Sequence, residues 1–458
     1  MKLNLSDIKQ VFFVGIGGIG MSAIARYFNS IGISVYGYDR VCSPISTSLE
    51  EEGISIVYDD DIDSIPKQFE NKESSLIVYT PAIPKTNKIL ESFKNSGLVI
   101  KKRSEILGLI ASNKKLVGVA GTHGKTTVST MVAHNIKNSN VDCSAFLGGI
   151  SKNYSSNLIL PKNNNTQITV MEADEFDRSF LHLYPDIAVI TSIEADHLDI
   201  YGSKEELQKA FNQYIGQIRE NGILIFKYGL DINCDKIKSY TYSYDNEESD
   251  FYISDLKIEN GKYIYNLHTP FGEISQIVAK YPGKINIENS VAAAAASLCA
   301  GVLPSELKSS IASFSGVKRR FDVQIDTKEL VFIDDYAHHP DELNAIISSV
   351  KELYPNKIVC GIFQPHLYTR TRDFSSAFGK ALNLLDKVYL LDIYPARELP
   401  IEGINSSFLS TKIDKGAIVL SKSELLDAIE KEDFDVLLTL GAGDIDRLVE
   451  PIANRLKK

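Results

Sequence analysis

The sequence predicts an α/β fold of three domains. The first domain is Rossmann-like, the central domain has a phosphate-loop type of parallel sheet with a small antiparallel sheet, and the last domain is again Rossmann-like. Three observations support this. The chain has 458 residues, which suits about three domains of ordinary size. Apolar segments alternate with helix-like segments, as in parallel sheets. Two apolar segments run into glycine-rich turns, each followed by a helix-like segment.

The first glycine-rich turn belongs to residues 1–112, the predicted first domain. A predicted strand at 11–14 precedes G-I-G-G-I-G at 15–20, a helix at 21–29 and a strand at 34–38 that ends at Asp39. This spacing matches the dinucleotide fingerprint, so the residues alone leave two hypotheses open: an NAD site, or a tight turn without a ligand. Thr80 follows a predicted strand at 76–79, at the end where open α/β sheets bind ligands.

The second glycine-rich turn opens residues 113–316, the predicted central domain. A strand beginning at Leu116 leads into G-T-H-G-K-T-T at 121–127, and a helix is predicted at 128–136. In this phosphate-loop geometry Lys125 would neutralise β- and γ-phosphates, and the Thr126 hydroxyl would bind Mg²⁺. The general motif has a further glycine where this chain has Val119. The pattern therefore predicts a nucleoside triphosphate site and does not identify the reaction.

Two later strands of the central domain end in carboxylates. The strand at 168–171 runs into Glu172, and the strand at 187–191 leads to Glu194, Asp196 and His197. The carboxyl ends of parallel strands share one edge of a sheet, so these groups should lie near the phosphate loop. Oxygen ligands near a triphosphate suit Mg²⁺, whereas a solvated acidic loop is the alternative.

Toward the end of the central domain the sequence pattern changes from that of a parallel sheet to that of an antiparallel one. Segments 240–244, 251–258, 263–267 and 274–278 have the pattern of short antiparallel strands. Asn286 and Asn289 then precede an alanine-rich helix at 291–298. The two amides are one helical turn apart and could both face a nucleotide base, although helix capping by Asn286 remains an alternative.

Residues 317–458 form the predicted last domain, after a hinge at 314–321. Arg319 and Arg320 could reach a transferring phosphoryl group, or form a solvated basic turn. Predicted strands at 330–333, 358–363, 388–391 and 436–440 all end in polar residues. Three of the eight histidines, His338, His339 and His366, lie in two of these strand ends.

The composition of the chain argues against a nucleic-acid-binding, membrane-spanning or secreted protein. The 49 basic and 59 acidic residues give a formal charge of −10, which argues against a nucleic-acid partner. No apolar run approaches the length of a membrane span, and the N-terminus has no signal-peptide core. The five cysteines are scattered without metal-site spacing, which favours reduced thiols. We therefore expect a cytoplasmic protein.

Taken together, these motifs resemble those of the Mur ligases of bacterial peptidoglycan synthesis over essentially the whole chain. The resemblance rests on a set of short motifs: G-I-G-G-I-G-M-S at 15–22, G-T-H-G-K-T-T at 121–127, E-A-D-E at 172–175, S-F-L-H-L at 179–183, E-A-D-H at 194–197, G-x-x-R-R-F at 316–321, D-D-Y-A-H-H-P at 334–340 and F-Q-P-H at 363–366. In that family the first glycine loop holds the UDP pyrophosphate of a sugar substrate. The resemblance thus replaces the NAD hypothesis.

The resemblance implies a reaction as well as a fold. It implies that ATP activates the lactyl carboxylate of UDP-N-acetylmuramate as an acyl phosphate, and that L-alanine then captures the acyl group, releasing ADP and phosphate. It implies ATP and Mg²⁺ as cofactors. Because ligand-type residues lie on three separate domains, we expect the last domain to close on ATP, in a monomer or weak homodimer. A related ligase that attaches a recycled tripeptide to the same sugar, and a nucleotide-sensing regulator, remain the rival hypotheses.

The resemblance also implies the roles of individual residues. The UDP-sugar would contact Gly17, Gly18, Ile19, Gly20, Asp39 and Thr80. ATP would contact Gly121, Thr122, His123, Gly124, Lys125, Thr126 and Thr127, with Asn286 and Asn289 at adenine and Asp335 at the ribose. The metal would take Thr126, Glu172 and His197. The catalytic set would be Lys125, Glu172, His197, Arg319 or Arg320, His338 and His366, and the amino acid would meet Tyr336, His366 and Arg370.

Overall fold

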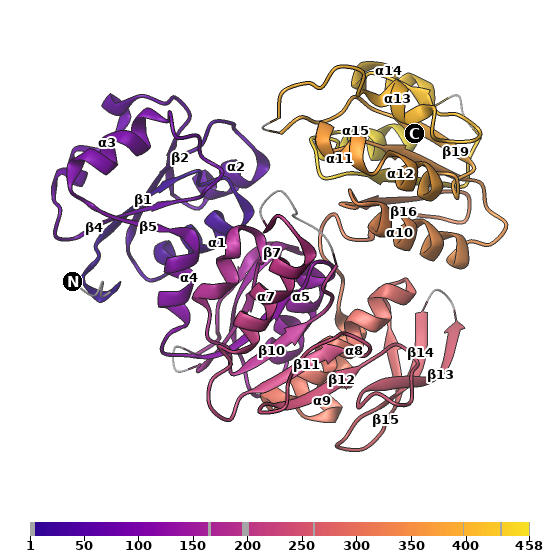
Figure 1. The fold of residues 1–458 in the computed structure, drawn as a ribbon, viewed down its shortest axis with the longest axis horizontal. Coiled ribbons are helices and arrows are strands. Elements are labelled where there is room, and N and C mark those ends of the chain that lie inside the picture. Colours follow the sequence, from indigo (N-terminus) through magenta and orange to yellow (C-terminus); the bar gives the residue numbers. More distant parts are fainter. Residues whose placement is uncertain are drawn as a thin grey trace. The chain divides into compact units, whose positions relative to one another are not determined.

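The fold is described from a computed structural model, for residues 5–163, 166–194, 201–259, 262–396, 398–430 and 433–457. The chain forms two compact units. The first comprises Met1–Ile258, Tyr263–Lys280 and Glu288–Ser315, and the second comprises Glu259–Lys262, Tyr281–Ile287 and Gly316–Lys458. Figure 1 shows the ribbon coloured along the sequence. Among the described residues, none of the helices is both long and apolar enough to cross a membrane.

The first unit begins with a five-stranded parallel sheet in the order β3-β2-β1-β4-β5. The strands are β1 (Gln10–Val14), β2 (Ser34–Tyr38), β3 (Ser55–Val57), β4 (Ser75–Tyr79) and β5 (Val99–Lys102). The helices are α1 (Ile19–Ser30), α2 (Pro44–Glu51), α3 (Lys88–Ser96) and α4 (Arg103–Ala111). Because the strand order reverses at β1, the turn after β1 lies where open α/β sheets bind their ligands.

The residues of β1 explain its central position. All five are buried, and the four apolar residues from Val11 to Val14 alternate between two clusters. Phe12 packs with Phe69 and Phe93 on one side of the sheet, whereas Phe13 packs with Phe28 of α1 on the other. A strand that is apolar on both faces is typical of a parallel sheet covered on both sides.

The first unit also contains a seven-stranded sheet in the order β12-β11-β10-β6-β9-β7-β8. Its strands are β6 (Lys115–Ala120), β7 (Ser144–Ser151), β8 (Ser156–Ile159), β9 (Ile168–Glu172), β10 (Ile187–Ile190), β11 (Ile223–Lys227) and β12 (Lys238–Tyr242). Only β8, which pairs with β7, is antiparallel. The helices are α5 (Lys125–Lys137), α7 (Lys204–Ile215), α8 (Lys284–Ala300) and α9 (Pro304–Ser313), with a 3-10 segment η4 (Phe176–His182).

One predicted strand has a different partner from the one expected. The segment 240–244 was expected in the small antiparallel sheet, but β12 pairs in parallel with β11, with Tyr240 opposite Ile225. Figure 1 shows β10, β11 and β12 side by side. The alternating tyrosines identify a half-buried strand, and this alternation is the same for a parallel edge strand as for an antiparallel one. The small sheet contains β13 (Tyr252–Glu259), β14 (Lys262–His268) and β15 (Ile274–Ala279).

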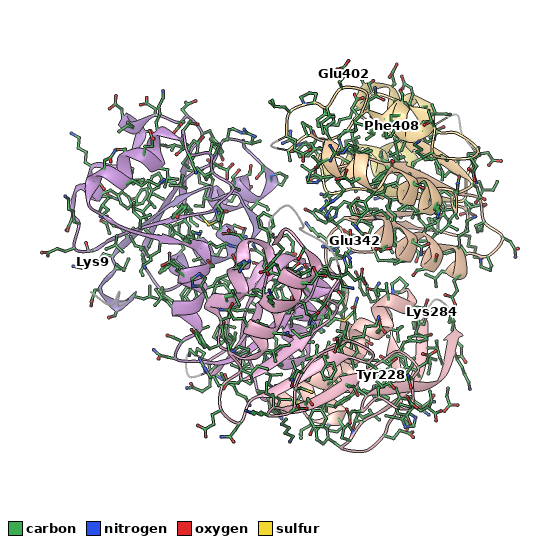
Figure 2. The ribbon with its side chains drawn as sticks, viewed as in Figure 1. Lys9, Tyr228, Lys284, Glu342, Glu402 and Phe408 are labelled. Atoms are coloured by element: carbon green, nitrogen blue, oxygen red, sulfur yellow. The ribbon has the colours of Figure 1, made fainter. Side chains whose placement is uncertain are left out.

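The second unit has a six-stranded sheet in the order β16-β17-β21-β18-β19-β20. Its strands are β16 (Asp322–Asp326), which is antiparallel, and the parallel strands β17 (Val331–Asp335), β18 (Val359–Phe363), β19 (Lys387–Leu390), β20 (Ile418–Val419) and β21 (Val436–Leu440). Its helices are α10 (Pro340–Leu353), α11 (Tyr368–Asp373), α12 (Ser375–Leu382), α13 (Ser406–Ser410), α14 (Lys422–Ile429) and α15 (Asp446–Leu456). Figure 2 draws the side chains, including Glu342 of α10, which takes part in the site below.

Candidate active site

The phosphate loop lies between β6, inside the seven-stranded sheet, and the start of α5 at Lys125. Gly121 and Gly124 both have positive φ, at 137° and 81°. A Cβ on Gly121 would lie 2.8 Å from the Ser192 amide nitrogen, so only glycine fits this backbone without movement. The predicted order of strand, glycine turn and helix is confirmed, although α5 begins three residues earlier than expected. Lys125, Thr126 and Thr127 therefore form its first turn.

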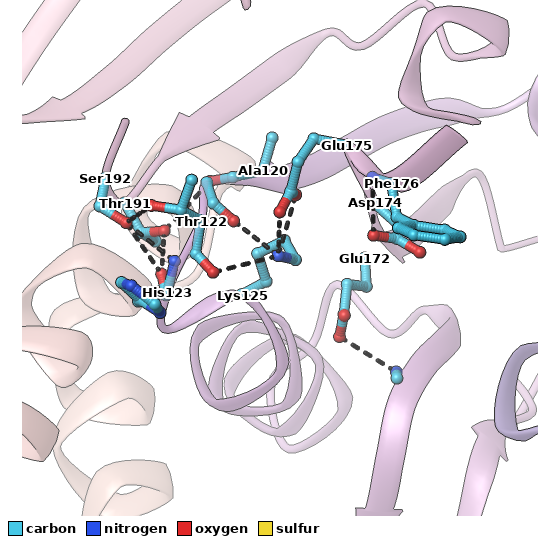
Figure 3. A network of polar contacts seen from close by, with 12 residues as sticks. Ala120, Thr122, His123, Lys125, Glu172, Asp174, Glu175, Phe176, Thr191 and Ser192 are labelled. Atoms are coloured by element: carbon cyan, nitrogen blue, oxygen red, sulfur yellow. Dashed lines mark hydrogen bonds and ion pairs between the residues drawn. The ribbon is translucent and has the colours of Figure 1, made fainter. Parts of the chain in front are cut away.

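The loop is held by the residues that follow β10 (Figure 3). The Thr122 amide donates to the Ser192 carbonyl at 3.1 Å, and the His123 amide donates to the Ser192 hydroxyl at 2.8 Å. The Thr191 hydroxyl donates to the His123 carbonyl, and His123 Nε2 lies 3.3 Å from a carboxylate oxygen of Glu194. Thr191 and Ser192 were not singled out from the sequence, although they directly follow the apolar strand. They fix the loop backbone by hydrogen bonds from a neighbouring strand.

Lys125 is held on two sides. Its Nζ donates to the Gly121 carbonyl at 2.7 Å and lies 2.9 Å from both carboxylate oxygens of Glu175. The Glu175 side chain is fully buried, and 12% of the Lys125 side chain is exposed. Burial acts to lower the pKa of Lys125, but Glu175, Asp174 and Glu172 outweigh it and raise the pKa, so the lysine is a cation. Glu175 was not among the predicted site residues, although it is the last residue of the E-A-D-E motif.

Two of the three predicted metal ligands, Thr126 and Glu172, lie among the described residues. Thr126 is buried in the first turn of α5, and Glu172 ends β9, where its carboxylate accepts a hydrogen bond from the Gly148 amide at 3.2 Å. Because β6 lies between β9 and β10, the structure brings these strand ends together as expected. His197 lies outside the described residues, and among those described no three His, Cys, Asp or Glu side chains gather around a common metal position. The hydroxyl and carboxylate oxygens present are the ligand types that Mg²⁺ prefers.

The two asparagines lie on α8, one turn apart as predicted. Asn289 is buried, and its side-chain oxygen lies 3.0 Å from the position of a Cβ on Gly124, so it directly contacts the phosphate loop. Asn286 belongs to the part of α8 that clusters with the second unit, and its amide group donates to the Pro282 carbonyl at 2.6 Å.

The first glycine loop connects β1 to α1 in the five-stranded sheet. The Asp39 carboxylate accepts a hydrogen bond from the Gly17 amide at 2.8 Å, and a Cβ on Gly15 would lie 2.8 Å from the Thr80 methyl group. The strand ends of β2 and β4 thus meet the turn, as the sequence predicted. Gly18 precedes the first residue of α1, Ile19. Because Asp39 binds the loop backbone, its carboxylate shapes the turn itself.

Arg103 is a residue of this region that sequence reasoning missed. Its guanidinium lies against Gly20, where a Cβ would clash with it, and it also pairs with the Asp174 carboxylate at 3.3 Å. It therefore joins the first glycine loop to the segment after β9. Arg103 opens α4 directly after two lysines that end β5, and this basic run is the feature of the sequence that could have identified it.

A second group of predicted residues lies in the second unit. The guanidinium groups of Arg319 and Arg320 lie 5.2 Å and 4.9 Å from the centre of the Tyr336 ring. Arg319 also pairs with the buried Asp334 at 3.4 Å. The Asp335 carboxylate accepts hydrogen bonds from the amides of residues 321 and 337, at 2.7 Å and 2.8 Å, and burial raises the pKa of Asp335. Asp335 thus joins the two-arginine turn to the turn after β17.

The histidines of the second unit form a row of rings. His338 lies edge-on to Tyr336, with centroids 5.2 Å apart, and edge-on to His366 at 5.9 Å. His366 stacks on Tyr394 at 5.8 Å, and His338 Nδ1 lies 3.1 Å from the carboxylate of Glu342. The predicted residues Tyr336, His338 and His366 are thus brought together, with Arg370 on the neighbouring α11. Tyr394 and Glu342 were not predicted, and Glu342 lies four residues after His338, one helical turn away.

The fold and this geometry define a class of protein: an α/β protein that carries both a phosphate loop and a Rossmann-type glycine loop. Comparison with protein families identifies the group more closely. Residues 10–115 match the Mur ligase family catalytic domain, residues 119–297 match the Mur ligase middle domain, and residues 319–443 match the Mur ligase glutamate ligase domain. The chain belongs to the Mur ligase family.

Similar proteins agree with this assignment. A UDP-N-acetylmuramate–L-alanine ligase of Porphyromonas gingivalis is 49% identical over 455 residues, covering 98% of this chain and 99% of that protein. One of Flavobacterium psychrophilum is 46% identical over 455 residues, covering 99% of each. Among solved structures, the UDP-N-acetylmuramate–alanine ligase of Thermotoga maritima matches with a TM-score of 0.82 at 26% identity, covering 98% of this chain and 99% of that one. The expected fold class and family are thus confirmed.

Proposed function

We propose that this protein is an ATP-dependent ligase that joins L-alanine to the lactyl carboxylate of UDP-N-acetylmuramate in cytoplasmic peptidoglycan precursor synthesis. The observation that carries the proposal is the 49% identity to a UDP-N-acetylmuramate–L-alanine ligase over nearly the full length of both chains. A phosphate loop whose lysine is a largely buried cation supports the use of ATP.

The proposed chemistry has two steps. A carboxylate oxygen of the sugar attacks the γ-phosphorus of ATP, and the bond from phosphorus to ADP breaks. The amine of L-alanine then attacks the acyl carbon, and the acyl–oxygen bond breaks to release phosphate. Both steps bring anionic groups together, so positioning and charge neutralisation are the main tasks of the protein.

We assign residues to these tasks as proposals. Lys125 and the amides of the phosphate loop bind the β- and γ-phosphates, and Asn289 faces the nucleotide with Asn286. The turn from Gly17 to Gly20 binds the UDP diphosphate. A Mg²⁺ ion held by Thr126, Glu172 and His197 would neutralise phosphate charge.

The residues of the second unit complete the proposed reaction. Arg319 or Arg320 contacts phosphate, and Asp335 contacts the ribose. The amino acid contacts a group of four residues: Tyr336, His338, His366 and Arg370.

The proposed domains are residues 1–112, 113–316 and 317–458. The last domain closes on ATP, and the protein is a monomer or weak homodimer.

The test is release of phosphate from ATP. We expect release only when UDP-N-acetylmuramate and L-alanine are both present, and almost none from the Lys125→Ala variant. Lys209→Ala, which removes a largely exposed lysine from α7, serves as the control and should retain activity. Release that does not require the sugar would contradict the proposal.

A second candidate arises from another solved structure. A murein peptide ligase of Psychrobacter arcticus shares the fold, with a TM-score of 0.70 at 21% identity, covering 98% of each chain. Competition between L-alanine and the tripeptide L-alanyl-γ-D-glutamyl-meso-diaminopimelate, which is named for a related ligase of Neisseria, distinguishes the two. We expect L-alanine to be the preferred acceptor, and preference for the tripeptide would favour the second candidate.

A further inference from the structure

Glu175 is a fully buried carboxylate beside the phosphate loop, and the proposed mechanism gives it no task. Both of its side-chain oxygens lie 2.9 Å from Lys125 Nζ. In Figure 3 the Glu175 carboxylate points at the lysine ammonium from the side opposite the α5 helix. Burial raises the pKa of Glu175, and the Lys125 ammonium opposes that shift.

The backbone of Glu175 is fixed from several directions. Its carbonyl accepts hydrogen bonds from the Arg178 amide at 2.9 Å and from the Tyr201 hydroxyl at 2.6 Å. The neighbouring Ala173 amide donates to the Val119 carbonyl of β6 at 2.8 Å. The segment that carries Glu175 is thus hydrogen-bonded to the strand that leads into the phosphate loop.

The lysine ammonium occupies a defined position as a result. Besides Glu175, it donates to the carbonyls of Gly121 at 2.7 Å and Thr122 at 3.4 Å. A largely buried ammonium without a counterion is unfavourable in free energy. Lys125 therefore needs a carboxylate nearby while no phosphate is bound. Glu172 and Asp174 have partners of their own, at Gly148 and Arg103.

We propose that Glu175 is a positioning residue, which holds the Lys125 ammonium in place and acts as its counterion until nucleotide phosphates arrive. The proposal rests on the proposed function, since it takes the loop to bind a nucleotide. It implies competition: phosphates and Glu175 both attract the same ammonium. Glu175 lowers nucleotide affinity and in return keeps the lysine aligned for phosphoryl transfer.

The test is Glu175→Gln, which removes the charge and keeps the shape. We expect ADP to bind about tenfold more tightly above neutral pH, because the competing anion is gone. We expect kcat to fall by about tenfold or more, because the ammonium is no longer held in alignment. Calorimetry with ADP, with and without Mg²⁺, measures the affinity, and phosphate release measures kcat. Glu175→Asp restores the charge and should return the ADP affinity toward that of the wild type.

Asp177→Asn is the matched control. Asp177 lies in the same segment, has a positive φ that asparagine tolerates, and pairs with Lys102 at 3.8 Å. The substitution removes one negative charge close by in the sequence and leaves the contacts between Lys125 and Glu175 unchanged. Equal tightening by Asp177→Asn would overturn the proposal, as would ADP affinity that is unchanged or weakened by Glu175→Gln.

Two further variants distinguish the possible failures. If wild-type protein binds no ADP, the proposed function fails; if it binds ADP and Lys125→Ala abolishes binding while Glu175→Gln changes nothing, only this inference fails. If Glu175→Gln does not fold, the double variant Lys125→Met, Glu175→Gln is the alternative. It removes both charges and should fold. Failure of that double variant to fold would also contradict the proposal.

Discussion

Gly121 shows how one backbone angle shapes the phosphate loop. Its φ of 137° is outside the range that side-chain-bearing residues favour, and backbone nitrogens of Thr191 and Ser192 lie within 3.0 Å of the position that a Cβ would take. The same residues hold the loop through hydrogen bonds. The sequence predicted the glycine but could not show which strand approaches it, because that contact joins positions about 70 residues apart.

We predict that Gly121→Ala destabilises the protein by about 3 kcal/mol and abolishes ADP binding, because the new methyl group must displace backbone. Urea unfolding and calorimetry measure the two effects. Gly32→Ala is the matched control: Gly32 also has a positive φ, at 81°, but nothing lies within 4 Å of its Cβ position. It should cost about 1 kcal/mol and leave ADP binding intact. Equal effects of the two variants would contradict the steric explanation.

At the scale of elements, Asn157 joins strand β8 of the seven-stranded sheet to helix α1. This fully buried side chain of β8 donates to the Ile19 carbonyl at 2.5 Å and to the Ser22 hydroxyl at 2.9 Å, both in the first turn of α1. It also accepts a hydrogen bond from Arg26 at 2.6 Å. The strand after β7 therefore fixes the helix that follows the first glycine loop.

We predict that Asn157→Leu lowers the free energy of unfolding by about 3 kcal/mol, because buried polar groups on α1 lose their partners. Asn212→Leu, at an exposed position of α7, should change stability by no more than about 0.5 kcal/mol. Urea denaturation at neutral pH measures both variants. A change at Asn157 as small as that at Asn212 would show that the α1 groups find other partners.

His134 joins α5 to Tyr154 and to the end of α9, and it makes the stability of the protein depend on pH. Its Nδ1 contacts the Tyr154 hydroxyl at 3.0 Å, and its Nε2 contacts the Ser310 carbonyl and Ser313 hydroxyl at 3.1 Å and 2.9 Å. Burial lowers the pKa of His134 from 6.5 to about 4, against a smaller opposing effect of the Ser310 hydrogen bond. Between these pH values the unfolded chain binds the proton and the folded chain does not.

Stability should therefore fall as pH falls from 6.5 to about 4, and this pH dependence is absent above 6.5. We predict that the wild type loses about 3 kcal/mol more than His134→Gln over this range, from the size of the shift. Chemical denaturation at several pH values measures the difference. Parallel curves for the two proteins would contradict the burial of a neutral imidazole.

The elements also show what the sequence could and could not predict. Strand–glycine–helix order, the asparagine pair and the polar strand ends followed from local patterns, and the structure bears these out. The parallel pairing of β12, and the contacts of Arg103 and Tyr394, depend on which segments meet across the fold. Local periodicity does not contain that information, so these features were mistaken or missed.

At the scale of the whole molecule, the residues proposed for catalysis are distributed along the chain, from Gly17 to Arg370. The two glycine loops and the acidic strand ends belong to the first unit, whereas the arginine pair and the histidine row belong to the second. The family could be recognised from the sequence because its motifs are short and local. The role of each residue in the reaction stays a proposal, since it depends on bound substrates.

The central claim is that ATP activates a carboxylate that an amine then captures. The most direct measurement places ¹⁸O at both oxygens of the lactyl carboxylate of UDP-N-acetylmuramate and analyses the released phosphate by mass spectrometry after reaction with ATP and L-alanine. Because a carboxylate oxygen becomes the bridge to phosphorus, we predict that each phosphate carries one labelled oxygen. Phosphate without the label, formed together with the amide product, would contradict activation through an acyl phosphate.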